Sequence, residues 1–108
     1  MDFEFVETII FTKQILNILS DEDYGELQMR LIEKPERGVL IPGSGGIRKL
    51  RWAIAGKGKS GGVRVLYYLY LSDRQIYMLY VFKKSQRSDL TREQLSVLGE
   101  YVKKYLKR

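Results

Sequence analysis

Residues 63–82 have the sequence VRVLYYLYLSDRQIYMLYVF, and this stretch decides the fold of the chain. Two runs rich in valine, leucine and tyrosine, residues 63–71 and 76–82, flank the short polar turn Ser72-Asp73-Arg74. β-Branched and aromatic residues favour strands, and so short a connection joins strands that run in opposite directions. The stretch therefore predicts an antiparallel hairpin.

A third strand is predicted just before this hairpin, in residues 47–54. Side chains alternate between the two faces of a strand, so one face carries Leu50, Trp52 and Ile54 and the other carries Lys49, Arg51 and Ala53. The connection to residue 63 is a glycine-rich loop, residues 55–62, that includes Lys57 and Lys59. Its simplest interpretation is a second hairpin tip.

Helices are predicted before and after these strands in the sequence. The apolar residues of positions 8–19 cover a wide helical face, which suits a helix buried on more than one side. Ser20, followed by three acidic residues, is a typical N-cap, and the second helix that it begins ends before Pro35. Thr91 and Gln94 match a capping box, which starts a C-terminal helix with the apolar stripe Leu95, Leu98, Val102 and Leu106.

The predicted order is (β)ααβββα in one domain, residues 1–108. Residues 3–6 are a candidate short first strand, and residues 36–46 are a turn-rich connector. With 44% hydrophobic and 12% aromatic residues the chain can bury a core. We expect an α+β fold with the helices packed on one face of an antiparallel sheet.

The composition excludes several kinds of site. There is no cysteine, so neither a disulfide nor a thiolate ligand is possible, and there is no histidine, the commonest metal ligand and proton shuttle. No stretch approaches the ~18 apolar residues of a membrane span, and the acidic N-terminus does not look like a leader. We therefore expect a cytoplasmic protein without metal, cofactor or membrane contact.

Charge is segregated along the chain, whose net charge is +6. Residues 1–37 hold nine acidic and four basic side chains. Residues 38–64 hold no acidic and six basic side chains, and residues 65–108 hold four acidic and nine basic side chains. A basic block with no internal counter-charge favours a polyanionic partner. No acidic residue occurs between Glu36 and Asp73. The cations in this stretch are Arg37, Arg48, Lys49, Arg51, Lys57, Lys59 and Arg64.

Three of these cations are predicted to share one sheet face. Lys49 and Arg51 are two positions apart in the predicted strand of residues 47–54, so they share a face. A hairpin brings Arg64, of the predicted strand of residues 63–71, near them. Like charges opposite each other across strands are unfavourable by up to ~1 kcal/mol per pair, which favours retention for an anionic ligand. The alternatives are a solvated face or salt bridges to the acidic first third of the chain.

Other candidate features each have two interpretations. Tyr68 and Tyr80 suit base stacking beside cations, or simply strand packing. The segment with Lys83, Lys84 and Arg87 extends the cationic rim or is an ordinary polar loop. Residues 56–61 match G-x-G-x-x-G, but a strand rather than a helix follows, which favours a cationic hairpin tip over a nucleotide site.

Taken together, the motifs resemble those of the RelE/HigB-like toxins of bacterial toxin–antitoxin pairs, most closely the HigB-type branch. The resemblance spans essentially the whole chain and rests on residues 45–51, 56–62, 64–68 and 84–91. It implies a curved antiparallel sheet and an endoribonuclease that cleaves messenger RNA in the ribosomal decoding site. It also implies a cognate antitoxin that holds the toxin inactive, and we expect a monomer when the antitoxin is absent.

The resemblance also implies residue roles. Lys49 and Arg51 match the basic pair that contacts RNA near the scissile phosphate, Arg64 matches the arginine that steadies this phosphate, and the stretch with Lys84 and Arg87 matches the basic residues after the last strand. Thr91 stands where some members have a tyrosine that acts as base, and the histidines of other members are absent.

The chemistry needs little from the protein, because RNA carries its own nucleophile, the 2′-hydroxyl. Arg64 and Lys84 would stabilise the transition state, Tyr68 or Tyr80 would orient the base, and Arg48, Lys57, Lys59, Lys83 and Arg87 would bind the backbone. A lysine among other cations releases its proton more readily, so Lys49 is a candidate proton acceptor. A basic RNA- or DNA-binding module without catalysis, or a domain that docks an acidic protein, would explain the same charge pattern.

Overall fold

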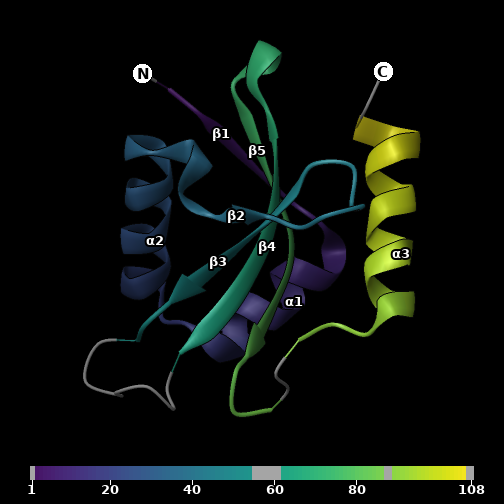
Figure 1. The fold of residues 1–108 in the computed structure, drawn as a ribbon. Coiled ribbons are helices and arrows are strands. Elements are labelled where there is room, and N and C mark those ends of the chain that lie inside the picture. The colour runs from purple at the N-terminus through teal and green to yellow at the C-terminus, as the bar shows by residue number, and fades with distance from the viewer. Residues whose placement is uncertain (1, 55–61, 87–88, 107–108) are drawn as a thin grey trace.

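The computed structural model describes residues 2–54, 62–86 and 89–106, which form a five-stranded sheet with α-helices on both sides (Figure 1). None of the helices in these residues is long and apolar enough to cross a membrane. The main elements are β1 (Glu4–Glu7), α1 (Ile9–Ile18), α2 (Asp21–Glu33), β2 (Val39–Leu40), β3 (Ile47–Trp52), β4 (Val63–Tyr70), β5 (Gln75–Lys83) and α3 (Arg92–Tyr101).

The strand order is β1-β5-β4-β3-β2, and the predicted α+β class is confirmed. The hairpin of β4 and β5 forms as predicted, with a 3₁₀ turn at Leu71–Asp73 and Arg74 in a left-handed conformation, φ 53°. The sheet is mixed rather than wholly antiparallel, because β1 pairs with β5 in parallel. The connector also contributes the short strand β2, which pairs with β3, where the sequence predicted only turns.

The helices cover both faces of the sheet rather than one. Apolar residues of α1 and α2 pack against the face that carries Leu50, Val65 and Tyr67. Val102 and Leu106, which follow α3, pack against the other face, on Ile47, Leu66 and Leu79. A bulge in β5 explains the second contact: Leu66 pairs with Tyr80 and Tyr67 with Met78, so Leu79 is an extra residue. Leu79 therefore joins Tyr80 on this face and supplies the apolar surface on which the C-terminal segment packs.

The helix caps follow the sequence. The side chains of Thr8 and Ser20 accept hydrogen bonds from the backbone at the starts of α1 and α2, and both hydrogen bonds of the Thr91–Gln94 capping box are present. The burial of α1 on more than one side is not observed. Ile9 and Leu16 are 78% and 72% exposed, because only the side of α1 with Phe11 and Ile15 faces the sheet.

The connector before β3 is fixed by the buried side chain of Tyr67. Its hydroxyl accepts a hydrogen bond from the Gly38 backbone N–H at 2.7 Å and donates one to the Pro35 carbonyl at 2.7 Å. Burial raises the pKa of this hydroxyl. A Cβ on Gly38 would lie 2.8 Å from the Tyr67 ring, so only glycine fits this close approach. These contacts place β2 along β3.

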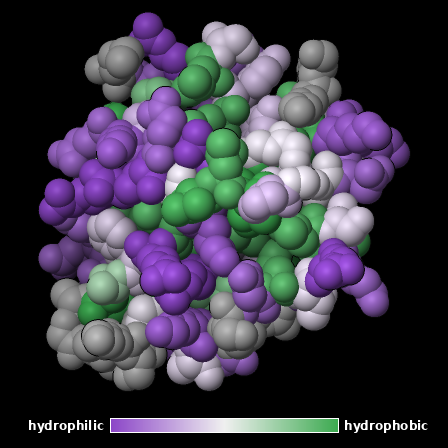
Figure 2. Space-filling model, in the orientation of Figure 1, coloured by the Kyte–Doolittle hydropathy of each residue, from purple (hydrophilic) through white to green (hydrophobic). Residues whose placement is uncertain are grey.

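Hydrophobic residues gather in the middle of the face shown in Figure 2, with hydrophilic residues around them. The exposed side chains of β2 are apolar, with Val39 73% and Leu40 52% exposed. Because β2 is an edge strand of the sheet, these two apolar side chains lie beside unpaired backbone groups.

Candidate anion-binding site

Strands β3 and β4 bring the three predicted cations onto one sheet face. Arg51 pairs directly with Arg64, and Lys49 pairs with Leu66, two residues further along β4. Directly opposite residues of an antiparallel pair project on the same side, and so do residues two apart along a strand. Lys49, Arg51 and Arg64 therefore project from the same face, which is the face that carries the C-terminal helical segment.

Arg64 is the buried member of this cluster. It is 9% exposed, and it lies between Arg51 on β3 and Phe82 on β5. Its Nη1 donates a long hydrogen bond, 3.4 Å, to the Val63 carbonyl, and no ion pair links it to another described residue. Burying a charge is unfavourable unless a counter-charge accompanies it. A guanidinium in this setting is prepared to bind an anion, such as a phosphate, that comes from outside.

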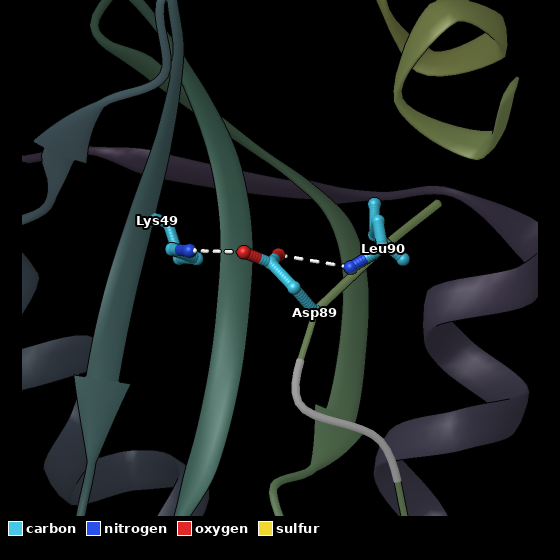
Figure 3. A network of polar contacts seen from close by, with 3 residues as sticks. All are labelled: Lys49, Asp89 and Leu90. Atoms are coloured by element: carbon cyan, nitrogen blue, oxygen red, sulfur yellow. Dashed lines mark hydrogen bonds and ion pairs between the residues drawn. The ribbon is translucent and has the colours of Figure 1, made fainter. Parts of the chain in front are cut away.

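Lys49 has a partner within the chain, as Figure 3 shows. Its Nζ donates to Oδ2 of Asp89 at 2.8 Å, and Oδ1 of the same carboxylate accepts from the Leu90 backbone N–H at 2.8 Å. The hydrogen bond from Lys49 holds the pKa of Asp89 below its usual range. From the sequence we grouped Lys49 with other cations and considered counter-charges only from the acidic first third of the chain, not from Asp89. The observed carboxylate places a counter-charge against Lys49, and its role as a proton acceptor stays a prediction.

The acidic first third of the chain does not neutralise the cluster in the described residues. The Glu7 carboxylate accepts hydrogen bonds from Thr12 and Tyr24, both at 2.6 Å. Burial, together with the bond to Glu7, raises the pKa of Tyr24. Glu4 accepts from Gln75 at 2.8 Å, while Glu26 and Glu33 flank Arg30 on α2. These acidic residues therefore hold the N-terminal elements together.

The two lysines at the end of β5 and just after it divide between the two faces. Lys84 is exposed, and its backbone N–H donates to the Gly62 carbonyl at 3.1 Å, which extends the pairing of β4 and β5 by one residue. Lys84 itself lies in the turn after β5, and extending the alternation of β5 by this one residue assigns it to the side of Phe82 and Arg64. Lys83 pairs with Val63 and belongs to the opposite face. The candidates Lys57, Lys59 and Arg87 lie outside the described residues.

Arg48 and the tyrosines have mainly structural surroundings. Arg48 Nη1 donates to the carbonyls of Gly38 at 2.8 Å and Glu36 at 3.3 Å, on the face opposite Lys49. Tyr68 is on the cationic face but 9% exposed within the core, and burial raises its pKa. Tyr80 is half-buried, with its ring centroid 6.1 Å from that of Phe82.

The structure adds two residues to the site that sequence reasoning did not single out. Phe82 is next to Arg64 across the hairpin, and its position follows from the register. Asp89 lies two residues before the Thr91 cap, so the sequence did contain its signal: the capping box fixes where α3 begins, and a carboxylate just before this point has a defined place. No cluster of acidic side chains suited to a metal ion occurs in residues 2–54, 62–86 and 89–106.

Solved structures of known fold resemble this one. This chain is similar to a doubly substituted E. coli toxin RelE in the free state, with a TM-score of 0.58 and 16% identity. The match covers 98% of this chain and all of that one. The intact E. coli RelBE toxin–antitoxin complex gives a TM-score of 0.56 and 15% identity, covering 76% of this chain and 96% of that one. An archaeal RelE–RelB complex from Pyrococcus horikoshii gives a TM-score of 0.54 and 18% identity, covering 81% of this chain and all of that one.

The sequence supplies the decisive comparison, since identities this low establish the fold alone. Residues 12–108, about nine tenths of the chain, match the family model described as the RelE toxin of the RelE/RelB toxin–antitoxin system. The match includes α2, all four strands from β2 to β5, and the three cations of the candidate site. This chain belongs to the RelE toxin family.

Proposed function

We propose that this protein is the toxin of a toxin–antitoxin pair and that it cleaves messenger RNA on the ribosome. One observation carries the proposal: Arg64 is buried, lies directly opposite Arg51 and has no ion-pair partner among the described residues. A protein that keeps two guanidinium groups opposite each other gains from an anion that bridges them. Membership of the RelE toxin family supports RNA as the source of that anion.

The proposed reaction is an attack of the 2′-hydroxyl oxygen on the adjacent phosphorus. The bond from phosphorus to the 5′-oxygen breaks, the 2′-hydroxyl loses its proton, and the departing 5′-oxygen gains one. The products are a 2′,3′-cyclic phosphate and a 5′-hydroxyl end. No metal is required, because the nucleophile belongs to the RNA and the protein's task is to orient it and to stabilise negative charge.

The cationic face would stabilise the phosphate as its charge increases. Arg64 and Arg51 supply guanidinium donors from two neighbouring strands, and Lys84 adds an ammonium on the same side. Preorganised donors of this kind often contribute several kcal/mol to a barrier. In this proposal Lys49 binds phosphate through its ammonium group. Tyr80, beside Phe82, is the aromatic residue best placed to contact a base.

The biological setting belongs to the same proposal. The motifs in residues 45–51 and 84–91 support the HigB-type branch of the family. A cognate antitoxin is supported by the solved complexes of RelE with RelB. We further propose that the protein acts in the cytoplasm, where translating ribosomes are found, and that it is a monomer when free of antitoxin.

The test expresses the protein alone in a bacterial host and maps the ends of cellular transcripts. The wild type is expected to arrest growth and to produce new 5′-hydroxyl ends, and Arg64→Ala or Lys84→Ala should abolish or strongly reduce both effects. Arg30→Ala is the matched control, because it removes the same charge from α2, where Arg30 lies between two glutamates.

A nucleic-acid-binding module without catalysis is the second candidate. It is favoured by the absence of histidine from the chain and by Thr91, which is not a base at neutral pH. Transcripts that stay intact on ribosomes, although the purified wild type binds RNA and Arg64→Ala does not, would establish this candidate and exclude the nuclease.

A further inference from the structure

The Lys49–Asp89 ion pair puts a carboxylate on a surface that otherwise presents cations. A carboxylate and a phosphodiester offer the same kind of acceptor to an ammonium group, a negatively charged oxygen at ~2.7–2.9 Å. Asp89 Oδ2 lies 2.8 Å from Lys49 Nζ and thus takes up one of the positions that a phosphate oxygen would use.

This carboxylate is held at a defined place but is free to leave it. Its Oδ1 accepts the Leu90 backbone N–H, and the capping box just beyond fixes the start of α3. The side chains of Lys49 and Asp89 are nevertheless 28% and 53% exposed. Ion pairs this accessible contribute little to stability, so a competing anion can replace one of the partners.

The other cations of the cluster have no carboxylate in direct contact. No ion pair among the described residues involves Arg51 or Arg64, although the charge of Arg64 also helps to lower the pKa of Asp89. An anion can therefore bind these two guanidinium groups while the Lys49–Asp89 pair stays closed. A longer ligand that also places a phosphate at Lys49 has to open the pair.

We propose that Asp89 competes with a bound phosphate for Lys49. The Asp89 carboxylate pairs with the Lys49 ammonium in the free protein and is displaced when a nucleic-acid strand binds. The inference rests on the proposed function for the nature of the ligand. It makes Asp89 a residue that limits affinity, and it assigns to the start of α3 a direct influence on the cationic face.

The test measures binding of a single-stranded DNA decamer by fluorescence anisotropy at fixed salt. DNA has no 2′-hydroxyl, so binding is observed without cleavage. Asp89→Asn is expected to tighten binding about two- to fivefold, the factor that corresponds to giving up one exposed ion pair. Asp73→Asn removes the same charge at the far end of the β4–β5 hairpin and should change binding less than 1.5-fold, roughly the limit set by screening.

A double-mutant cycle with Lys49→Gln makes the test specific. If Asp89 competes for Lys49, Asp89→Asn adds nothing in the Lys49→Gln background. An equal gain in that background would show a long-range charge effect and overturn the proposal. Weaker binding of Asp89→Asn would show that the carboxylate positions Lys49, and unchanged or undetectable binding would also overturn it.

The same variants separate this inference from the proposed function. Tighter binding by Asp89→Asn together with intact cellular transcripts would refute the nuclease and leave the competitor in place. Cleaved transcripts with no gain in binding would refute the competitor and leave the nuclease in place.

Discussion

Replacing Arg64 by methionine is expected to make the protein more stable and inactive. Arg64 is 9% exposed and directly opposite Arg51, so the folded state carries both the desolvation of a charge and a repulsion between like charges. The repulsion alone is worth up to ~1 kcal/mol. Methionine keeps an unbranched apolar stem of similar length and removes the charge. We expect the free energy of unfolding to rise by about 1–2 kcal/mol when the desolvation is included.

Chemical denaturation followed by circular dichroism measures this gain, and a thermal scan should show a rise in Tm of roughly 4–10 °C for a domain of this size. The gain should be larger at low ionic strength, where repulsion is less screened. Arg51→Met is the matched control: it relieves the same repulsion but removes no buried charge, so its gain should be at most about 1 kcal/mol and smaller than that of Arg64→Met.

The opposite sign would refute the reasoning. If Arg64→Met lowers the free energy of unfolding by more than about 1 kcal/mol, the guanidinium makes net favourable contacts within the protein and is not held in reserve for an anion. The argument for the candidate site would then lose its main support.

Three further predictions concern the residues that position the site. Tyr67→Phe leaves the buried Gly38 N–H without its acceptor and should cost about 1–3 kcal/mol in denaturant unfolding, whereas Tyr105→Phe, at a residue 56% exposed, should cost almost nothing. Thr91→Ala removes the cap of α3 and should cost about 1 kcal/mol in the same assay. The folded-state pKa of Asp89 is lowered, so its ion pair contributes stability above the ordinary carboxyl pKa and loses it as pH falls through the folded value. Since the pair is half exposed, the free energy of unfolding of the wild type should exceed that of Asp89→Asn by at most about 1 kcal/mol at pH 7. This difference, measured by denaturant unfolding, should vanish near pH 2.

Local patterns in the sequence predict most of the fold. Alternation fixes the faces of β3 and β4, because a strand has only two faces, and the capping residues Ser20 and Thr91 fix where helices begin. The parallel pairing of β1 leaves no local pattern, since its partner β5 lies far along the chain. The placement of the C-terminal segment on the second face depends on the bulge at Leu79, and alternation counting alone assigns that residue to the wrong side.

The candidate site was predictable as a set of cations but not as a set of contacts. The register that opposes Arg51 to Arg64 follows from the hairpin, whereas the burial of Arg64 depends on packing around β4. Arg48 was expected to bind the RNA backbone, and alternation already places it on the face opposite Lys49, but its hydrogen bonds to the Gly38 and Glu36 carbonyls depend on the connector. Asp89 reaches Lys49 across 40 positions of sequence, a contact that only the tertiary structure creates.

The parallel docking of β1 has a consequence for how the protein is made. Thr8 donates to the carbonyl of Leu79, a contact that spans 71 residues of sequence, so the first strand has no partner until the fifth has been translated. At ~5–20 residues per second, this delay lasts on the order of 4–14 seconds, to which the time for clearing the ribosomal tunnel is added. During that interval the apolar side chains of the emerging N-terminal segment have no sheet to cover. A nascent chain of this kind completes its architecture only near the end of synthesis, and non-local strand pairing of this sort is intrinsically slow to form.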